Sequence, residues 1–117
     1  MTTEERLALL KKARAATAAT IDEIKRRLNV EPLFDVRRTL SPILIRARNQ
    51  LTDLDLMIND LEGATDPIAL DPAQLTELDR LSAQLDKAIV RDALIGLAVD
   101  SVTSVLQSVQ EVRDTLA

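Results

Sequence analysis

The sequence contains no cysteine, histidine, tyrosine or tryptophan, and Phe34 is its only aromatic residue. Without cysteine the chain cannot form a disulfide, supply a thiol nucleophile or bind a metal through thiolates. Without histidine it lacks the commonest general base and the commonest metal ligand. These absences exclude most familiar catalytic and metal-binding arrangements, so we expect a protein that is not an enzyme and has no cofactor. The lack of disulfides fits a cytoplasmic location.

Glycine and proline are scarce too, with two and four residues among 117. Both residue types interrupt helices, so their scarcity in a sequence rich in leucine and alanine predicts long helices joined by few turns. A chain of this length corresponds to one domain, over residues 1–117. No apolar run approaches the roughly 18 residues that a membrane-spanning helix needs, so we expect no membrane span.

Charge is divided unevenly between the two halves of the chain. Residues 1–50 contain 11 Lys and Arg against 6 Asp and Glu, which gives +5; residues 51–117 contain 4 against 13, which gives −9 and a total of −4. Either basic and acidic helices pack together, within the fold or across a dimer, or the basic half binds anions. Seven cations surround the first predicted connection and form the possible anion site: Lys25, Arg26, Arg27, Arg37, Arg38, Arg46 and Arg48.

The first two helices are predicted from capping residues and apolar spacing. Thr2 and Glu5 have the spacing of a capping box, and apolar residues follow at intervals of three and four, which predicts a helix over about 3–28. A second helix is predicted over 35–62, where Gly63 ends it, and Pro42 either begins this helix or kinks it. Phe34, in the connection, is expected to pack against the end of the core.

The third helix has a clear beginning and no clear end. Asp71 can cap it, Pro72 suits its first position, and Gln74 can complete a capping box. From there to residue 116 apolar residues recur at steps of three and four, which is typical of helices that supercoil. A straight helix over 72–116 would be about 67 Å long, whereas a compact chain of this size has a diameter of roughly 35 Å.

Two arrangements accommodate this length. In the preferred one, an antiparallel hairpin packs on a long third helix in an all-α, coiled-coil-like bundle, and the end of that helix pairs with a second copy in a homodimer. In the alternative, the third helix breaks near Gly96 and folds back to close a four-helix bundle. The segment from Leu97 to Val99 lacks turn-forming residues, which favours the unbroken helix.

The preferred arrangement predicts an interface with a second copy or another protein. Residues 93–99 are apolar on every side, which indicates cover from more than one direction. The function that fits is a non-enzymatic interaction or oligomerisation module, such as an adaptor, scaffold or accessory subunit of a bacterial or phage-type assembly. The predicted interface consists of Leu94, Ile95, Leu97, Val99, Val102, Val105, Leu106, Val109, Val112 and Leu116.

Two alternative functions stay open at this point. The basic cluster between residues 25 and 48 is able to bind the phosphates of a nucleic acid in a salt-dependent manner, although the chain has no aromatic platform for single strands. The amphipathic helices also permit coating of a lipid or polymer surface.

Overall fold

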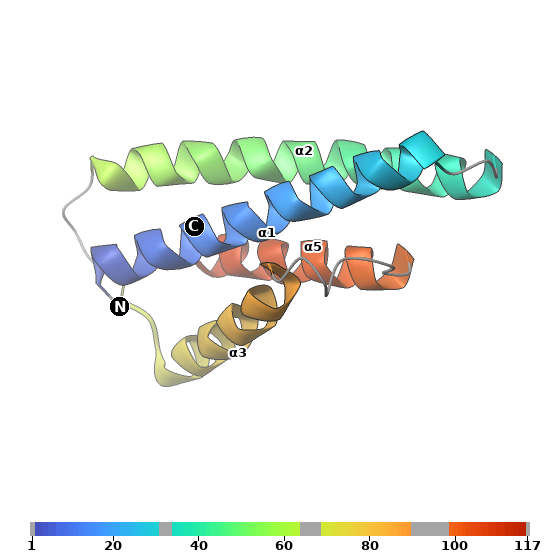
Figure 1. Ribbon diagram of the computed structural model, residues 1–117. Helices are drawn as coiled ribbons and strands as arrows, with labels where there is room; N and C mark the ends of the chain where they lie inside the picture. The colour runs from blue at the N-terminus through green and yellow to red at the C-terminus, as the bar shows by residue number, and fades with distance from the viewer. Residues whose placement is uncertain (1, 31–33, 64–68, 90–98, 117) are drawn as a thin grey trace.

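The computed structural model describes residues 2–30, 34–63, 69–89 and 99–116, and all regular structure in these ranges is α-helical (Figure 1). The helices are α1 (Thr3–Val30), α2 (Phe34–Glu62), α3 (Pro72–Ile89) and α5 (Val99–Leu116). They pack together as a helical bundle, which confirms the all-α fold class. None of the described helices combines the length and the apolar composition needed to cross a bilayer.

The hairpin of α1 and α2 runs along the long dimension of a molecule that measures 50 × 25 × 19 Å (Figure 1). At the start of α1, the Glu5 backbone N–H donates to Thr2 Oγ1 at 3.1 Å, so Thr2 caps the helix. Ala13, Ala16 and Ala47 have no exposed surface. Their small side chains leave room for the two helices to pack closely along their length.

α3 and α5 lie side by side rather than end to end (Figure 1). Ser108 Oγ donates to Gln84 Oε1 at 3.0 Å, and Arg80 lies 3.7 Å from the Glu111 carboxylate. In a continuous helix residues 84 and 108 would be about 36 Å apart. The preferred prediction of one helix over 72–116 is therefore wrong, and the alternative, in which the chain folds back to close the bundle, describes how the helices of the described residues are arranged. The break expected near Gly96 falls in residues 90–98, outside the described residues.

The apolar register that predicted a long helix has a different cause. α3 and α5 each contribute a stripe with steps of three and four, and both stripes enter the same core beside α1 and α2. Two helices that face one core show the same spacing as one helix that continues. The buried residues of this core on α3 and α5 are Leu78, Leu81, Leu85, Val109, Val112 and Leu116.

A second, smaller core fills the opposite half of the hairpin. It joins residues from the end of α1 to residues from the start of α2, and α5 contributes Leu106. Two fully buried threonines on α1, Thr17 and Thr20, donate to the carbonyl oxygens one turn earlier, at 2.8 Å each, so their hydroxyl groups are satisfied. The buried residues of this core are Ile21, Ile24, Leu40, Leu44, Ala47 and Leu106.

Candidate interaction surface

The C-terminal stripe predicted to meet a second copy lies in the core of the chain itself. Leu106, Val109, Val112 and Leu116 have at most 1% of their surface exposed, and Val105 packs, partly buried, against the larger of the two cores. The fold-back of α5 onto α1 and α3 provides this cover, because it supplies within one chain the burial that the predicted dimer was to supply. The burial of the stripe thus gives no reason to assign it to a partner.

The remaining predicted interface positions have side chains that the structure does not place. Leu94, Ile95 and Leu97 lie outside the described residues, and only the backbone of Val99 and Val102 is described.

The predicted basic cluster is divided between two places. The cations near the end of α1 and the start of α2 share one end of the hairpin (Figure 1), whereas Arg46 and Arg48 lie about 12 Å or more further along α2. The cations at the shared end are Lys25, Arg26, Arg27, Arg37 and Arg38.

Glu23 offsets part of the positive charge at the end of the hairpin. Its carboxylate is buried, lies 2.6 Å from Arg26 Nη2 and is 3.5 Å from Arg27 Nε. The hydrogen bond from Arg26, with the charges of both arginines, lowers the pKa of Glu23 against the opposing effect of burial. Arg37 donates to the Leu28 carbonyl and so ties α2 to the end of α1. This end is therefore less electropositive than the sequence alone predicts.

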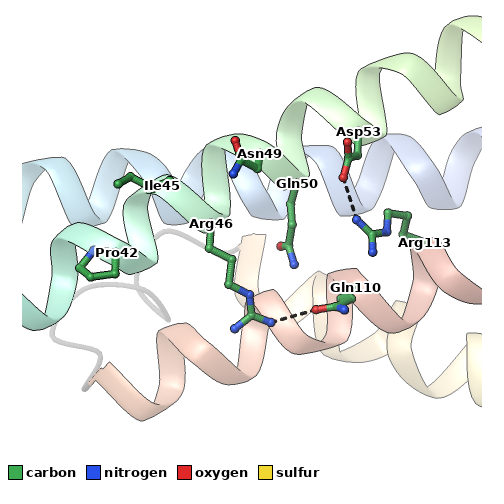
Figure 2. A pocket seen from close by; sticks show the side chains of 8 residues that line it. All are labelled: Pro42, Ile45, Arg46, Asn49, Gln50, Asp53, Gln110 and Arg113. Atoms are coloured by element: carbon green, nitrogen blue, oxygen red, sulfur yellow. Dashed lines mark hydrogen bonds and ion pairs between the residues drawn. The ribbon is translucent and has the colours of Figure 1, made fainter.

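A polar groove separates α2 from α5 (Figure 2). Its volume is about 330 Å³. Arg46, Gln50 and Asp53 reach from α2 toward α5, whereas Ile45 does not (Figure 2). The groove is lined by Pro42, Ile45, Arg46, Asn49, Gln50, Asp53, Gln110 and Arg113.

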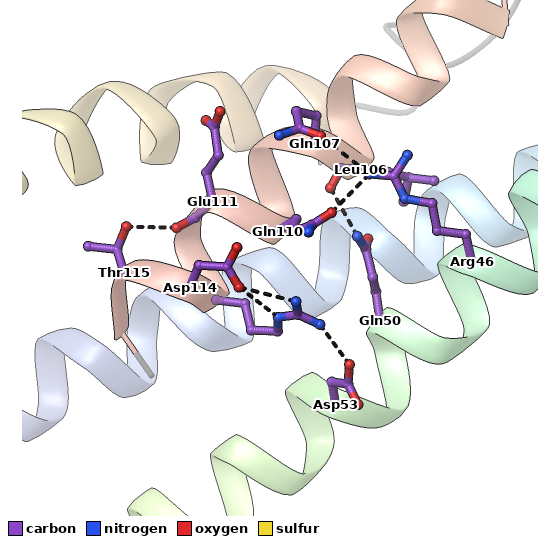
Figure 3. A network of polar contacts seen from close by, with 10 residues as sticks. Arg46, Gln50, Asp53, Leu106, Gln107, Gln110, Glu111, Asp114 and Thr115 are labelled. Carbon is purple, nitrogen blue, oxygen red and sulfur yellow. Dashed lines mark hydrogen bonds and ion pairs between the residues drawn. The ribbon is translucent and has the colours of Figure 1, made fainter.

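Hydrogen bonds across this groove hold α5 to α2 (Figure 3). Arg46 Nη2 donates to Gln110 Oε1 at 3.1 Å, and the buried Gln50 donates from Nε2 to the Leu106 carbonyl at 3.3 Å. Arg113 Nη1 lies 2.7 Å from Asp53 Oδ2. These contacts make the groove a link between helices of the fold, although the buried Gln50 Oε1 has no hydrogen-bond partner among the described residues. The apolar rim of the groove consists of Pro42 and Ile45.

A second groove, between α1 and α3, has a volume of about 320 Å³. Lys12 closes part of it, because its ammonium donates to Ser82 Oγ at 2.8 Å and lies 3.0 Å from Asp86. This groove is thus another site of helix–helix contact. The second groove brings the Ser82 hydroxyl to the Lys12 ammonium, but Lys12 acts there as a hydrogen-bond donor and as the ion-pair partner of Asp86, not as a base. No three metal-ligating side chains converge among the residues that the structure describes.

The outer face of α2 is the surface that the sequence analysis missed. Phe34, Ile45 and Leu56 are 73%, 60% and 57% exposed. They are spaced by eleven residues, close to three helical turns, so they lie on one side of α2. Phe34 was expected to pack against the core, and this prediction is wrong. The eleven-residue spacing was the available signal, but no core-forming pattern of threes and fours accompanies it.

We define the outer face of α2 by the exposed residues that share this side. The described parts of the other helices leave it uncovered, because α2 packs through its opposite side against α1 and, less extensively, against α5. The face mixes apolar, amide and charged side chains: Phe34, Arg38, Ser41, Ile45, Arg48, Asn49, Thr52, Leu56, Asn59 and Asp60.

Comparison of the chain with known family models, curated proteins and solved structures finds no match. The surfaces of this chain are therefore the basis for inferring its function. Among them, the outer face of α2 differs from the two grooves, since its apolar side chains have no described neighbour to bury them.

Proposed function

We propose that this protein is a non-enzymatic helical interaction module that docks on a macromolecule through the outer face of α2. The observation that carries the proposal is the exposure of Phe34, Ile45 and Leu56 on one side of one helix. Fully burying such a side chain is worth about 1.5–3 kcal/mol. A partner that covers all three gains a substantial part of this free energy.

The remaining alternatives draw less support from the described residues. Binding of a nucleic acid needs several unpaired cations on one surface. Glu23 pairs with two of the cations at the end of the hairpin, Arg26 and Arg27, and offsets one of their two charges. Coating of an apolar surface needs stripes that the bundle uses for its own two cores. Both alternatives, and the cytoplasmic location, stay predictions from the sequence.

Site-specific photo-crosslinking in cells that express the full chain tests the proposal. A photoreactive phenylalanine derivative in place of Ile45 is expected to yield discrete adducts with one macromolecule, and Leu56→Glu in the same chain is expected to abolish them. The matched control places the same derivative at Asp79, an exposed position on α3. Equal labelling from both positions, or no adduct from position 45, contradicts a docking role for the outer face.

A further inference from the structure

The charges of α2 are arranged against its own helix dipole. Residues 34–48 contain four arginines and one aspartate, and residues 49–62 contain four acidic residues and no cation. Acidic side chains are favourable near the start of a helix and basic ones near its end. Only Asp35, in the first turn, follows this rule, whereas Asp60 and Glu62 stand in the last turn of α2 and no cation does. Such a distribution destabilises α2 by itself, which points to compensation from outside the helix.

We propose that the outer face of α2 binds a second copy of the same chain, with the two α2 helices antiparallel across a two-fold axis. This inference rests on the proposed docking role of that face and names its occupant. An antiparallel pair sets the basic half of each helix against the acidic half of the other, and it opposes the two helix dipoles as well. A parallel pair would set like charges together, so the charges select one orientation.

The apolar residues fix the register of the pair. The midpoint between Ile45 and Leu56 falls between Gln50 and Leu51. A two-fold axis at this point places Ile45 of each copy opposite Leu56 of the other, since residues in such an interface contact each other reciprocally. Leu56 of the second copy then lies beside Ile45 at the apolar rim of the groove between α2 and α5.

The same register brings the central charges into opposition. Arg46 and Asp53 lie seven residues apart, as do Arg48 and Asp55, so the members of each pair share one edge of the helix. Across the axis, Arg46 of one copy comes within about 3 Å of Asp53 of the other, measured along the helix, and Arg48 comes equally near to Asp55. Within the chain Arg46 already donates to Gln110, and Asp53 and Asp55 bind Arg113 and Arg14. The two aspartate side chains are nevertheless 47% and 44% exposed and can accept a second cation.

The outer charges follow the same rule. Arg38 and Asp60 lie on the outer face, and the axis brings them within about 5 Å along the helix. Both are exposed, and neither forms an ion pair within the part of the chain that the structure describes. Arg37 and Glu62 are brought together in the same way. One register therefore aligns two reciprocal apolar contacts and sets the four arginines of α2 beside the four acidic residues of its second half.

The first test measures the molar mass of the full chain by light scattering over a range of concentrations. We expect a monomer–dimer equilibrium that weakens with added salt. Ile45→Glu and Arg38→Glu are each expected to raise the dimer dissociation constant at least about tenfold, because every substitution acts twice in a two-fold interface and like charges in an interface cost several kcal/mol. The controls are Lys11→Glu on α1 and Asp79→Arg on α3, which are exposed elsewhere and are expected to leave the mass unchanged.

A charge exchange makes the test specific for the antiparallel pair. Arg38→Glu and Asp60→Arg each place like charges together in their own homodimers. When the two variants are mixed, both symmetric contacts again join opposite charges, so we expect dimers at concentrations where each variant alone is monomeric. Dimers that ignore these substitutions, or mixtures that stay monomeric, overturn the proposal.

The crosslinking experiment separates this inference from the proposed function. An adduct from position 45 with twice the mass of the chain supports the second copy. A monomeric chain that crosslinks from position 45 to a different macromolecule overturns the second copy but leaves the docking role intact. A monomeric chain without adducts overturns both.

Discussion

Glu23 and Glu77 form the same local ion pair in two different environments. Each carboxylate binds the arginine three residues later, Arg26 or Arg80, and in each case the hydrogen bond from that arginine is the main cause of a lowered pKa. Glu23 is 8% exposed and has Arg27 as a second partner, whereas the side chain of Glu77 is 46% exposed. The pair on α1 therefore tests how much burial strengthens an ion pair that solvent otherwise screens.

Glu23→Gln is expected to lower stability at neutral pH and to lose this effect in acid. The pKa of Glu23 in the folded chain lies below its ordinary value of 4.5. A carboxylate of this kind stabilises the fold above its unfolded-state pKa, and the stabilisation disappears as the pH falls through the folded-state value. Urea unfolding at a series of pH values should show a full and constant difference between the parent and Glu23→Gln well above pH 4.5, and a difference that shrinks as the pH falls below that value.

The matched variant is Glu77→Gln. Because solvent screens the exposed pair, we expect a smaller loss of stability at neutral pH, and salt should remove most of it. Equal effects of the two substitutions, or a Glu23→Gln variant whose deficit grows in acid, would show that burial does not strengthen the pair on α1.

At the scale of the helix, α2 contains a residue that helices normally exclude. Pro42 lies in the interior of α2, and a proline there removes the hydrogen bond to the carbonyl four residues earlier, in this case that of Arg38. Pro42 is exposed and belongs to neither core. Its cost in helix stability is therefore not offset by packing among the described residues.

Pro42→Ala is expected to raise the free energy of unfolding, by up to about 3 kcal/mol. Alanine restores the missing N–H and has the highest helix propensity. Thermal unfolding followed by the helical circular dichroism signal measures the change. Pro72→Ala is the matched control, since Pro72 occupies the first position of α3, where no partner for an N–H is needed. A Pro42→Ala variant that melts below the parent would mean that the proline shapes α2 for its contacts with α1 and α5.

Helix beginnings were the part of the fold that local chemistry could predict. Asp71 Oδ1 accepts from the Gln74 backbone N–H at 2.8 Å, and the Asp71 backbone N–H donates to Gln74 Oε1 at 3.0 Å, which is the reciprocal capping box expected for α3. These signals depend on residues a few positions apart, so the sequence displays them directly. The separation of α3 from α5 was not predictable in this way. The same apolar spacing continues in both helices, and the segment between them contains no strong turn signal apart from Gly96.

Surfaces were harder to predict than helix ends. The C-terminal stripe from Val105 to Leu116 was assigned to a partner because a straight third helix left it uncovered, and the fold-back covers it. The outer face of α2 went unnoticed because exposure depends on which helices pack where, which is a property of the tertiary arrangement. Only the eleven-residue spacing of Phe34, Ile45 and Leu56 is local, and three residues spaced so widely do not form a pattern that predicts burial or exposure.

At the scale of the whole molecule, the contact between α3 and α5 decides how the chain is closed. Gln84 and Ser108 meet across it, with 3.0 Å between their side-chain oxygens. In a closed four-helix bundle both belong to one chain. In a domain-swapped dimer with a straight helix over 72–116, Gln84 would meet Ser108 of the second copy instead, and the local contact would look the same.

Paired cysteines distinguish these two ways of closing the bundle. The chain has no cysteine of its own, so Gln84→Cys combined with Ser108→Cys gives two unique thiols for a short bismaleimide. We expect rapid cross-linking within one chain, at a rate that does not depend on protein concentration and with the molar mass of a monomer under denaturing conditions. Gln84→Cys combined with Thr76→Cys is the control, since both residues lie on α3 more than two turns apart. Predominant cross-linking between chains in the first variant would show that α3 and α5 exchange between copies. The pairing through α2 would then join two swapped dimers, and the expected molar mass would be that of a tetramer.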